Sequence, residues 1–286
     1  YPGGSAANVA VGLTRLGQRV GFVGKLGDDA PGRRLLDAFK AEGIDMQKTL
    51  IETDRSTACC FITVDAQGER TIVVMPGVSL IEHPEELNPA YLSTARTLYI
   101  GPAYLDVAAV AVTAARRGSC TVFYAPGSPP GAEAQDDLVA LLRQIDVLLM
   151  SRSEAQTLTG LAAPSSAAMA LRAMGPPVVV VTAGARGAWV TEAASPTHVP
   201  AFTVHDVQDT TGAGDAFAAG LVAGHREGLD WVDAARMGCA VAALKIRQVG
   251  ARRGLPRRVQ VCALLNDAAP QPTMTQQTTE KNPRSY

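Results

Sequence analysis

The sequence predicts an α/β fold in which helices cover both faces of a mostly parallel sheet. Along most of the 286 residues, short apolar runs alternate with amphipathic segments of helical periodicity. This order is typical of strand–helix–strand units. The run PVVVVT, residues 177–182, is apolar throughout, as expected of a strand that is covered on both faces. The 47% hydrophobic content suffices for a large core in one α/β domain or two small ones.

The chain begins with a predicted helix, a strand and a second helix. Apolar residues recur at helical spacing after Ser5, which we expect to be the N-cap, and Gly17 ends this helix. A strand is predicted at residues 20–24. The next helix should start near Pro31, a favourable first-turn residue, and end at Gly43.

Residues 57–75 show a different pattern. Two strand-like runs, TACCFITVD and RTIVVMP, flank the polar turn AQGE, which predicts a β-hairpin beside the main sheet. The alternation then resumes. Further strands are predicted at residues 97–100, 120–124, 147–150 and 178–182. Helices are predicted at residues 107–117, 135–144, 154–159, 167–174 and 216–224. Parallel sheets of this kind bind ligands at the carboxyl ends of their strands.

The bulk properties limit the function classes. The net charge of −1 gives no electrostatic basis for binding nucleic acid or an anionic membrane. No apolar run is long enough to span a bilayer, and no signal peptide is visible, although the first residue is Tyr1 and not Met. The five cysteines show no C-x-x-C spacing. We therefore expect small buried thiols in a reducing cytoplasm, and neither metal ligands nor a disulfide framework.

One domain is predicted over residues 1–266. The segment after Asn266 is polar, contains prolines and lacks apolar periodicity. We expect residues 267–286 to be a disordered tail that takes no part in the site.

The stretch DTTGAGDAFAAG, residues 209–220, places three very small residues directly before an acid and a helix. The backbone N–H groups of Gly212, Ala213 and Gly214 can approach an anion closely, and the start of the helix adds its positive dipole. Such a loop suits a phosphate whose charge grows during a reaction. Asp215 would repel a resting phosphate, so its chemical purpose is that of a general base on an attacking hydroxyl. The helix start would help to keep this carboxylate ionised.

The alternative is an ordinary glycine turn followed by an acidic first-turn residue, and the pattern alone does not decide between the two. The loop is not a Walker A motif, because no G-K-[ST] follows the glycines.

The same stretch resembles the C-terminal signature of the ribokinase-like (PfkB-type) sugar and nucleoside kinases. GGSAANVAVGLTRLG resembles their N-terminal signature, and VGKLGDDAPGRRLLDAFKAEGID and VTAGARGAW match the family pattern in order and spacing. The resemblance covers roughly residues 1–265. It implies a three-layer α/β/α sandwich with a mostly parallel sheet and a small β lid at residues 57–75. It also implies transfer of the ATP γ-phosphate to a hydroxymethyl group of a sugar or nucleoside.

Carried over position by position, the resemblance implies four groups of site residues. The catalytic base is Asp215, with an anion hole formed by Gly212, Ala213 and Gly214. Substrate hydroxyls are held by Gly3, Gly4 and Asn8, since glycines allow close backbone approach and the amide both donates and accepts. The nucleotide site is lined by Ser151, Thr182, Gly184 and Gly187. Magnesium and its waters are organised by Glu154, since this ion needs few protein carboxylates.

Many members of the family also bind a monovalent cation such as K⁺ beside the anion hole, largely through backbone carbonyls. The matching positions are Asp209, Thr211, Lys245, Gln248, Gly250 and Gly254. Carbonyl ligands leave little trace in the side-chain sequence, so only the resemblance points to this site.

The chain departs from the family pattern in three places. Members usually begin with a strand that carries an Asp for substrate hydroxyls, whereas only Tyr1 and Pro2 precede the glycine pair here. The sheet would then have an open edge. Ser151 stands where many members carry Asn, and Ala125 stands where an Asp often follows the strand. Each of these departures puts one polar contact of the site in doubt.

The leading interpretation is an ATP-dependent kinase of a sugar or sugar acid. The GGSAAN start and the pair Arg70 and Thr71 after the lid turn favour a sugar, and only 5% aromatic residues disfavour a stacked purine acceptor. Two alternatives stay open: a nucleoside kinase of the same fold, and a non-catalytic sugar- or nucleotide-binding protein. Lids of this kind often pair between subunits, so the resemblance also leaves open a homodimer through the lid.

Overall fold

The computed structural model describes residues 2–64, 70–75, 77–128, 131 and 134–267. Within them the strands are β1 (Gly21–Gly27), β2 (Asp45–Glu52), β3 (Cys59–Val64), β4 (Arg70–Met75), β5 (Thr97–Ile100), β6 (Thr121–Tyr124), β7 (Val147–Ser151), β8 (Val178–Thr182), β9 (Ala188–Thr191) and β10 (Thr197–Val199). The α-helices are α1 (Ser5–Arg15), α2 (Ala30–Glu42), α3 (Pro89–Leu92), α4 (Leu105–Arg116), α5 (Gln135–Leu142), α6 (Arg152–Thr159), α7 (Pro164–Ala173), α8 (Ala213–Arg226), α9 (Trp231–Lys245) and α10 (Arg258–Asp267).

The central sheet has the strand order β10-β9-β8-β7-β6-β5. Strands β5 to β8 run parallel to one another, whereas β9 and β10 add to the β8 edge in antiparallel fashion. Helices α4 and α5 and the pair α6–α7 connect the parallel strands in turn. The predicted alternation is confirmed, and β8 has the predicted bounds. The antiparallel strands β9 and β10 were not predicted, because each is short and follows a tight turn.

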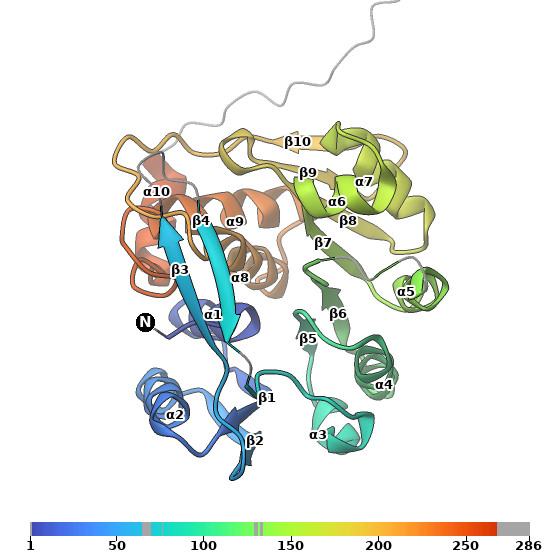
Figure 1. Ribbon diagram of the computed structural model, residues 1–286. Helices are drawn as coiled ribbons and strands as arrows, with labels where there is room; N and C mark the ends of the chain where they lie inside the picture. The colour runs from blue at the N-terminus through green and yellow to red at the C-terminus, as the bar shows by residue number, and fades with distance from the viewer. Residues whose placement is uncertain (1, 65–69, 76, 129–130, 132–133, 268–286) are drawn as a thin grey trace, which may run out of the picture.

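Alternate residues of the central strands point to opposite faces of the sheet. In β8, Val178 and Val180 pack into a core shared with α1, α8 and α9. Val179 and Val181 pack instead with α4, α5 and α7. Figure 1 shows these two groups of helices on either side of the sheet. The three-layer α/β/α sandwich is thus confirmed, and its period-two burial explains why the strand reads as one apolar run.

Helix α2 shows how local sequence sets the bounds of an element. The Asp29 carboxylate caps its start by accepting a hydrogen bond from the Gly32 N–H at 2.9 Å, and Pro31 lies in the first turn. Gly43 ends the helix in the left-handed conformation, with φ of 77°. Both predicted limits are confirmed, because each depends on the conformational preference of a single residue.

Strands β1 and β2 form a separate parallel pair, and β2 was not predicted. Among the described strands, β1 has no ladder with β5. A cavity of about 870 Å³ lies between these two strands and is lined also by α1 and α4.

The hairpin predicted at residues 57–75 is confirmed for its described part. Strands β3 and β4 are antiparallel, with Phe61 opposite Val73 and Cys59 opposite Met75. The turn residues 65–69 lie outside the described residues. The same holds for the side chains of Arg70 and Thr71, so their preference for a sugar is untested.

The cysteines divide into two groups. Cys120 and Cys239 are buried as predicted and Cys262 is partly buried, whereas Cys59 and Cys60 are both exposed. The prediction of buried thiols was therefore wrong for the adjacent pair. Their side chains point to opposite faces of a two-stranded hairpin, and neither face is covered at these positions.

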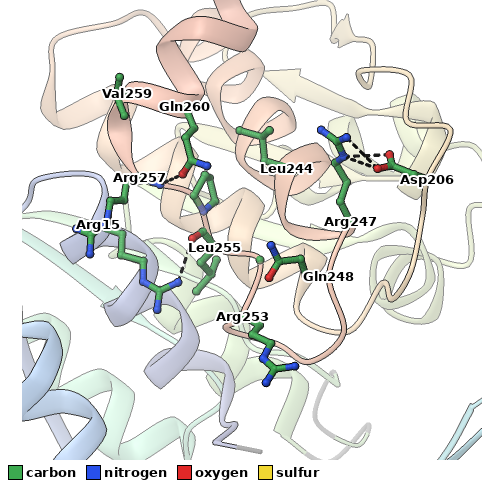
Figure 2. Close-up of a pocket in the computed structure, with 12 residues that line it drawn as sticks. Arg15, Asp206, Leu244, Arg247, Gln248, Arg253, Leu255, Arg257, Val259 and Gln260 are labelled. Atoms are coloured by element: carbon green, nitrogen blue, oxygen red, sulfur yellow. Dashed lines mark hydrogen bonds and ion pairs between the residues drawn. The ribbon is translucent and has the colours of Figure 1, made fainter.

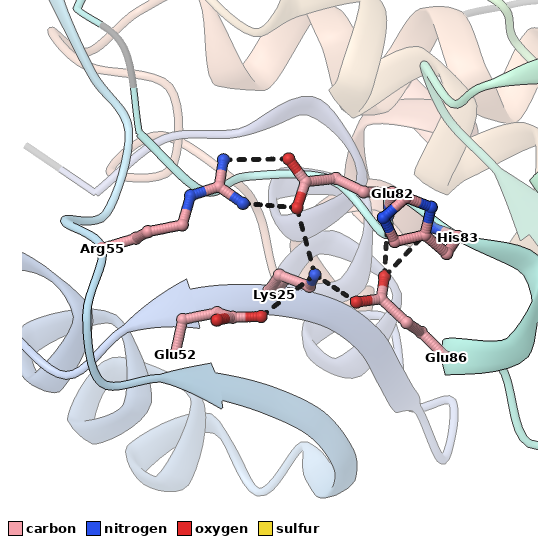
Figure 3. Close-up of polar contacts among 6 residues, drawn as sticks. All are labelled: Lys25, Glu52, Arg55, Glu82, His83 and Glu86. Carbon is pink, nitrogen blue, oxygen red and sulfur yellow. Dashed lines mark hydrogen bonds and ion pairs between the residues drawn. The ribbon is translucent and has the colours of Figure 1, made fainter.

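A cluster of charged side chains lies where the hairpin leaves the domain (Figure 3). The ammonium of Lys25 on β1 is only 2% exposed and contacts Glu52 at 3.1 Å, Glu82 at 3.2 Å and Glu86. Burial opposes its charge, but these hydrogen bonds outweigh burial and raise the pKa of Lys25. Glu82 also binds Arg55, which precedes the hairpin, and the two cations lower the pKa of Glu82 to about 2. The cluster therefore ties the base of the lid to β1.

Helix α10 ends at Asp267, and the predicted tail lies outside the part of the chain that the structure describes. Within that part, no helix combines the length and apolar character needed to cross a membrane.

Candidate active site

The loop at residues 209–215 meets the start of helix α8. The helix begins at Ala213, three residues earlier than predicted, and Gly212 is its N-cap in the left-handed conformation with φ of 76°. The Ala213 N–H donates to the Thr210 carbonyl at 3.0 Å. The N–H groups of Gly212 and Gly214 have no acceptor among the described residues. A side chain at Gly214 would meet no atom within 4 Å, so an anion has open access to this backbone.

Asp215 lies in the first turn of α8, directly beside these N–H groups. Its two carboxylate oxygens accept hydrogen bonds from the Ser5 hydroxyl and from the Asn8 amide, each at 2.7 Å. The expectation that Ser5 caps α1 was wrong. The N-cap is Gly4 with φ of 91°, and Ser5 is the first helical residue, so its hydroxyl is available to Asp215. Helix α1 thus holds the candidate base from the opposite end of the sequence.

Asn8 connects Asp215 to a buried arginine. Its amide oxygen accepts from Nε of Arg252 at 2.8 Å, and the same guanidinium donates to the Gly3 carbonyl at 2.6 Å. Asn8 is 4% exposed and Arg252 8% exposed. Both ends of the Asn8 amide are therefore engaged within the protein. Asn8 thus orients Asp215, and because its NH2 group carries a second hydrogen, its contact with substrate hydroxyls stays a prediction. Sequence reasoning missed Arg252, and no motif marked it.

The surroundings of Asp215 set its basicity. Burial raises its pKa above the ordinary value, although hydrogen bonds from Asn8 and Ser5 and the charges of Arg252 and Lys245 act in the opposite direction. The sequence had predicted a carboxylate kept ionised by the helix start. The pKa nevertheless lies above its ordinary value, because loss of water outweighs the favourable contacts, and the contribution of the helix start stays a prediction. A raised pKa makes Asp215 a better proton acceptor than an exposed aspartate.

The two N-terminal glycines lie at the start of α1. Gly3 is exposed and a side chain there would meet nothing within 4 Å, while its carbonyl is held by Arg252. Gly4 adopts a positive φ that only glycine adopts without strain. The backbone at this point is open to a ligand, so the predicted contact with substrate hydroxyls stays a prediction.

The carboxyl ends of β7 and β8 bring the predicted nucleotide residues together. Ser151 and Thr182 are register partners, as the last residues of these two strands. Ser151 caps α6, and Glu154 completes a capping box by accepting from the Ser151 N–H at 2.7 Å. The Ser151 hydroxyl also lies 3.1 Å from the Ser153 hydroxyl. This edge of the sheet is the one at which ligands of parallel sheets bind.

Tyr99, on β5, is a further titratable group near these residues. Burial first, and then the charges of Asp215 and Glu154, raise its pKa. Tyr99 thus lies within electrostatic range of both the candidate base and the candidate magnesium residue. Sequence reasoning did not select Tyr99, because an aromatic residue in an apolar strand carries no catalytic signal.

The loop after β8 contains two glycines with positive φ, Gly184 at 57° and Gly187 at 83°. A side chain at Gly184 would face open space, whereas one at Gly187 would meet the Val199 carbonyl oxygen at 2.0 Å. Gly187 is thus required for packing against β10. Gly184 is the member of the pair that faces open space, and its contact with a nucleotide stays a prediction.

The six residues expected around a monovalent cation lie in two segments, residues 209–211 and 245–254, that contact each other. The Asp209 carboxylate accepts from the N–H groups of Thr211 and Gly250, each at 2.8 Å, and the Asp209 carbonyl accepts from the Lys245 ammonium at 2.9 Å. The Lys245 carbonyl accepts from the Gln248 N–H at 3.3 Å. A side chain at Gly254 would meet that same carbonyl oxygen at 2.2 Å.

The segment after α9 also borders a surface cavity of about 710 Å³ (Figure 2). Four arginines line it, yet Arg15 donates to the Leu255 carbonyl at 3.0 Å and Arg247 pairs with Asp206 at 2.8 Å. None of the residues bound to Asp215 lines this cavity. Arg15 and Arg247 fasten the segment to α1 and to residue 206, and the cavity is lined also by Gln248 and Gly254, two of the residues expected around a monovalent cation.

Comparison with known proteins agrees with this geometry. The model of the pfkB family carbohydrate kinases matches residues 1–258. A protein of Archaeoglobus fulgidus named uncharacterized sugar kinase is 32% identical over 259 residues, which cover 87% of this chain and 100% of the relative. The crystal structure of a ribokinase from Thermotoga maritima has a TM-score of 0.80 at 27% identity and covers 93% of this chain and 88% of that one. An adenosine kinase from Sinorhizobium meliloti has a TM-score of 0.81 at 26% identity, covering 93% and 83%.

A helix start with open N–H groups lies beside a half-buried carboxylate, an arrangement that suits phosphoryl transfer. The chain belongs to the pfkB family of carbohydrate kinases. It is an enzyme that transfers a phosphoryl group to an alcohol, a sugar or nucleoside kinase, and kinases of this type use ATP. Family membership removes the alternative of a non-catalytic binding protein.

Proposed function

We propose that the protein transfers the γ-phosphate of ATP to a hydroxymethyl group of a sugar or sugar acid, with Asp215 as the general base. One observation carries the proposal. Asp215 is held by Ser5 and Asn8 at the start of α8, next to the open N–H groups of Gly212 and Gly214. A base and an anion hole therefore lie within one helical turn.

In the proposed step, Asp215 accepts the proton of the substrate hydroxyl while that oxygen attacks the γ-phosphorus. The bond between the γ-phosphorus and its bridging oxygen breaks, and ADP leaves. The N–H groups of Gly212 and Gly214 hold the charge that develops on the transferred group. Ser5 and Asn8 keep the carboxylate oriented toward the hydroxyl. Gly3 and Gly4 offer backbone groups to the remaining substrate hydroxyls.

Ser151, Thr182 and Gly184 are proposed to line the nucleotide site, since they lie at the carboxyl ends of β7 and β8 and on the open loop that follows. The donor set also fits Mg²⁺, a hard cation that keeps most of its waters and needs few carboxylates. One Glu154 oxygen accepts from the Ser151 N–H, and the other could hold a metal-bound water. Magnesium would neutralise phosphate charge. Because ATP is the donor, a cytoplasmic location belongs to the same proposal.

The lid supports a further part of the proposal, a homodimer. Its described face carries an apolar pair, Phe61 at 65% and Val73 at 55% exposed, directly opposite each other. Exposed apolar pairs of this kind are suited to a second subunit's lid, which supports a homodimer. A change in mass by light scattering between the wild type and Phe61→Asp would test it.

The substrate class has one competitor. The likeness to an adenosine kinase favours a nucleoside kinase as the second candidate. The deciding experiment measures ADP release from Mg-ATP across pentoses, ketohexoses, keto-deoxy sugar acids and nucleosides. A response to sugars or sugar acids supports the proposal, and a response to nucleosides alone supports the second candidate.

The role of Asp215 needs a variant with a matched control. Asp215→Asn should lower turnover by about 10²–10⁴, the usual contribution of a general base. The control is Asp206→Asn, in which a neighbouring exposed aspartate is changed, and it should leave turnover unchanged. An Asp215→Asn enzyme with normal turnover would remove Asp215 from the mechanism.

A further inference from the structure

Lys245, the last residue of α9, places its ammonium against the backbone of the loop at residues 209–215. It is 0% exposed, and its ammonium donates to the Asp209 carbonyl at 2.9 Å. Its charge also helps to lower the pKa of Asp209, together with hydrogen bonds from Thr211 and Gly250 and against the effect of burial. It acts on Asp215 in the same direction. A buried lysine is rare in proteins, so its position needs a reason.

The position of this ammonium coincides with the residues expected to hold a monovalent cation. The Asp209 carbonyl accepts from Lys245, and the two Asp209 carboxylate oxygens accept from the N–H groups of Thr211 and Gly250. The Lys245 carbonyl accepts from the Gln248 N–H. The carbonyl oxygens of Asp209 and Lys245, two of those that K⁺ would need, thus already face donors. An added cation would also lie close to a buried positive charge and be repelled by it. These residues do not fit K⁺.

The connection from Lys245 to the reaction is short. Asp209 begins the loop, and three residues further on the backbone reaches the proposed anion hole at Gly212 and Gly214. The Thr210 carbonyl between them holds the Ala213 N–H at 3.0 Å. A cation fixed to the Asp209 carbonyl therefore both positions the loop and adds positive potential behind the developing phosphate charge.

We propose that the Lys245 ammonium is a built-in replacement for the monovalent cation, which makes phosphoryl transfer by this enzyme independent of added K⁺. Lys245 is a positioning residue: it acts through the Asp209 carbonyl and its electrostatic potential, and does not touch the reacting atoms. The inference rests on the proposed function, because it concerns the anion hole of that reaction.

The test compares KCl with tetramethylammonium chloride at equal ionic strength. The wild-type enzyme should turn over its best substrate equally fast in both salts. Lys245→Met, which keeps the length of the side chain and removes the charge, should lower kcat by about tenfold or more, approaching the 10²–10³ of a lost anion-hole donor. Added K⁺ or methylammonium should restore part of that loss, because either cation can enter the vacated position.

Lys25→Met provides the matched control, because Lys25 is the other buried lysine among the described residues and lies at the lid base. Any loss of kcat in Lys25→Met should not be restored by K⁺ or methylammonium. Activation of the wild type by K⁺, unchanged kcat in Lys245→Met, or a loss that neither cation restores would each overturn the proposal.

A second readout needs no activity. The thermal unfolding midpoint of the wild type should be the same in both salts, whereas that of Lys245→Met should rise in KCl, since a cation that binds only the folded state stabilises it. A wild type that KCl stabilises would refute the proposal. If the wild type phosphorylates no substrate in either salt, the proposed function fails, and the melting comparison still decides the role of Lys245.

Discussion

Asn8 joins the candidate base to a buried guanidinium, and its replacement by leucine tests whether this chain controls the basicity of Asp215. Leucine is similar in size, keeps water out and can neither donate nor accept. Asp215 would lose its 2.7 Å hydrogen bond from the amide, and Nε of Arg252 would lose its 2.8 Å acceptor. Ser5 would remain as a donor to Asp215.

The magnitude follows from the kind of contact that is lost. A hydrogen bond to a charged group contributes about 1.5–3 kcal/mol net. Loss of the donor to Asp215 disfavours the ionised carboxylate. Because 1.36 kcal/mol corresponds to a tenfold change in proton affinity, the acid limb of kcat/KM should move up by about one pH unit or more. The unpaired Nε of Arg252 should lower the free energy of unfolding by about 2–3 kcal/mol, since a buried charged donor loses its partner.

The assay is a pH–rate profile of kcat/KM, recorded beside urea unfolding curves so that partial unfolding is not taken for a catalytic effect. Thr14→Val, on the same helix, removes only a hydroxyl that donates to the Ala10 carbonyl at 3.0 Å, and its profile should match the wild type. If Asn8→Leu folds and its acid limb stays in place or moves to lower pH, Asn8 does not stabilise the ionised base.

Three further predictions concern stability and reactivity. Because its pKa is raised, the ionised form of Asp215 destabilises the folded state. Asp215→Asn should therefore be more stable than the wild type at neutral pH, and this gain should disappear as pH falls below the unfolded pKa of aspartate. Melting curves at several pH values check this. Gly187→Ala should lower the free energy of unfolding by about 2–4 kcal/mol, because φ is 83° and the new methyl group would meet the Val199 carbonyl oxygen at 2.0 Å. A melting temperature equal to that of the wild type would refute the packing argument. Cys59 and Cys60 should react with a thiol reagent in the native protein while the buried thiols react only after unfolding, and mass mapping that finds the pair protected would contradict the exposed hairpin.

Much of the fold could be predicted from contiguous stretches of sequence. Capping residues and glycines fixed both ends of α2, and the apolar run of β8 located that strand to the residue. Predictions failed where contacts with residues distant in the sequence, or their absence, decided the position of a side chain. Ser5 had the properties of an N-cap, but the preceding glycine took that position and the hydroxyl turned to Asp215. The adjacent cysteines were expected to be buried, and the two-stranded hairpin leaves both exposed.

The same division holds for the candidate site. By itself the sequence determined that residues 209–220 combine very small residues, a carboxylate and a helix start, because these features are local and adjacent. Only the tertiary structure decided the hydrogen-bond partners and the pKa of this carboxylate. Ser5 and Asn8 lie more than 200 positions from Asp215, and Arg252 and Lys245 approach from the far end of α9 and the segment after it. Hydrogen bonding and desolvation act over a few ångströms of space, whatever the separation along the chain, so the packing of α1, α8 and α9 sets the chemistry of that acid.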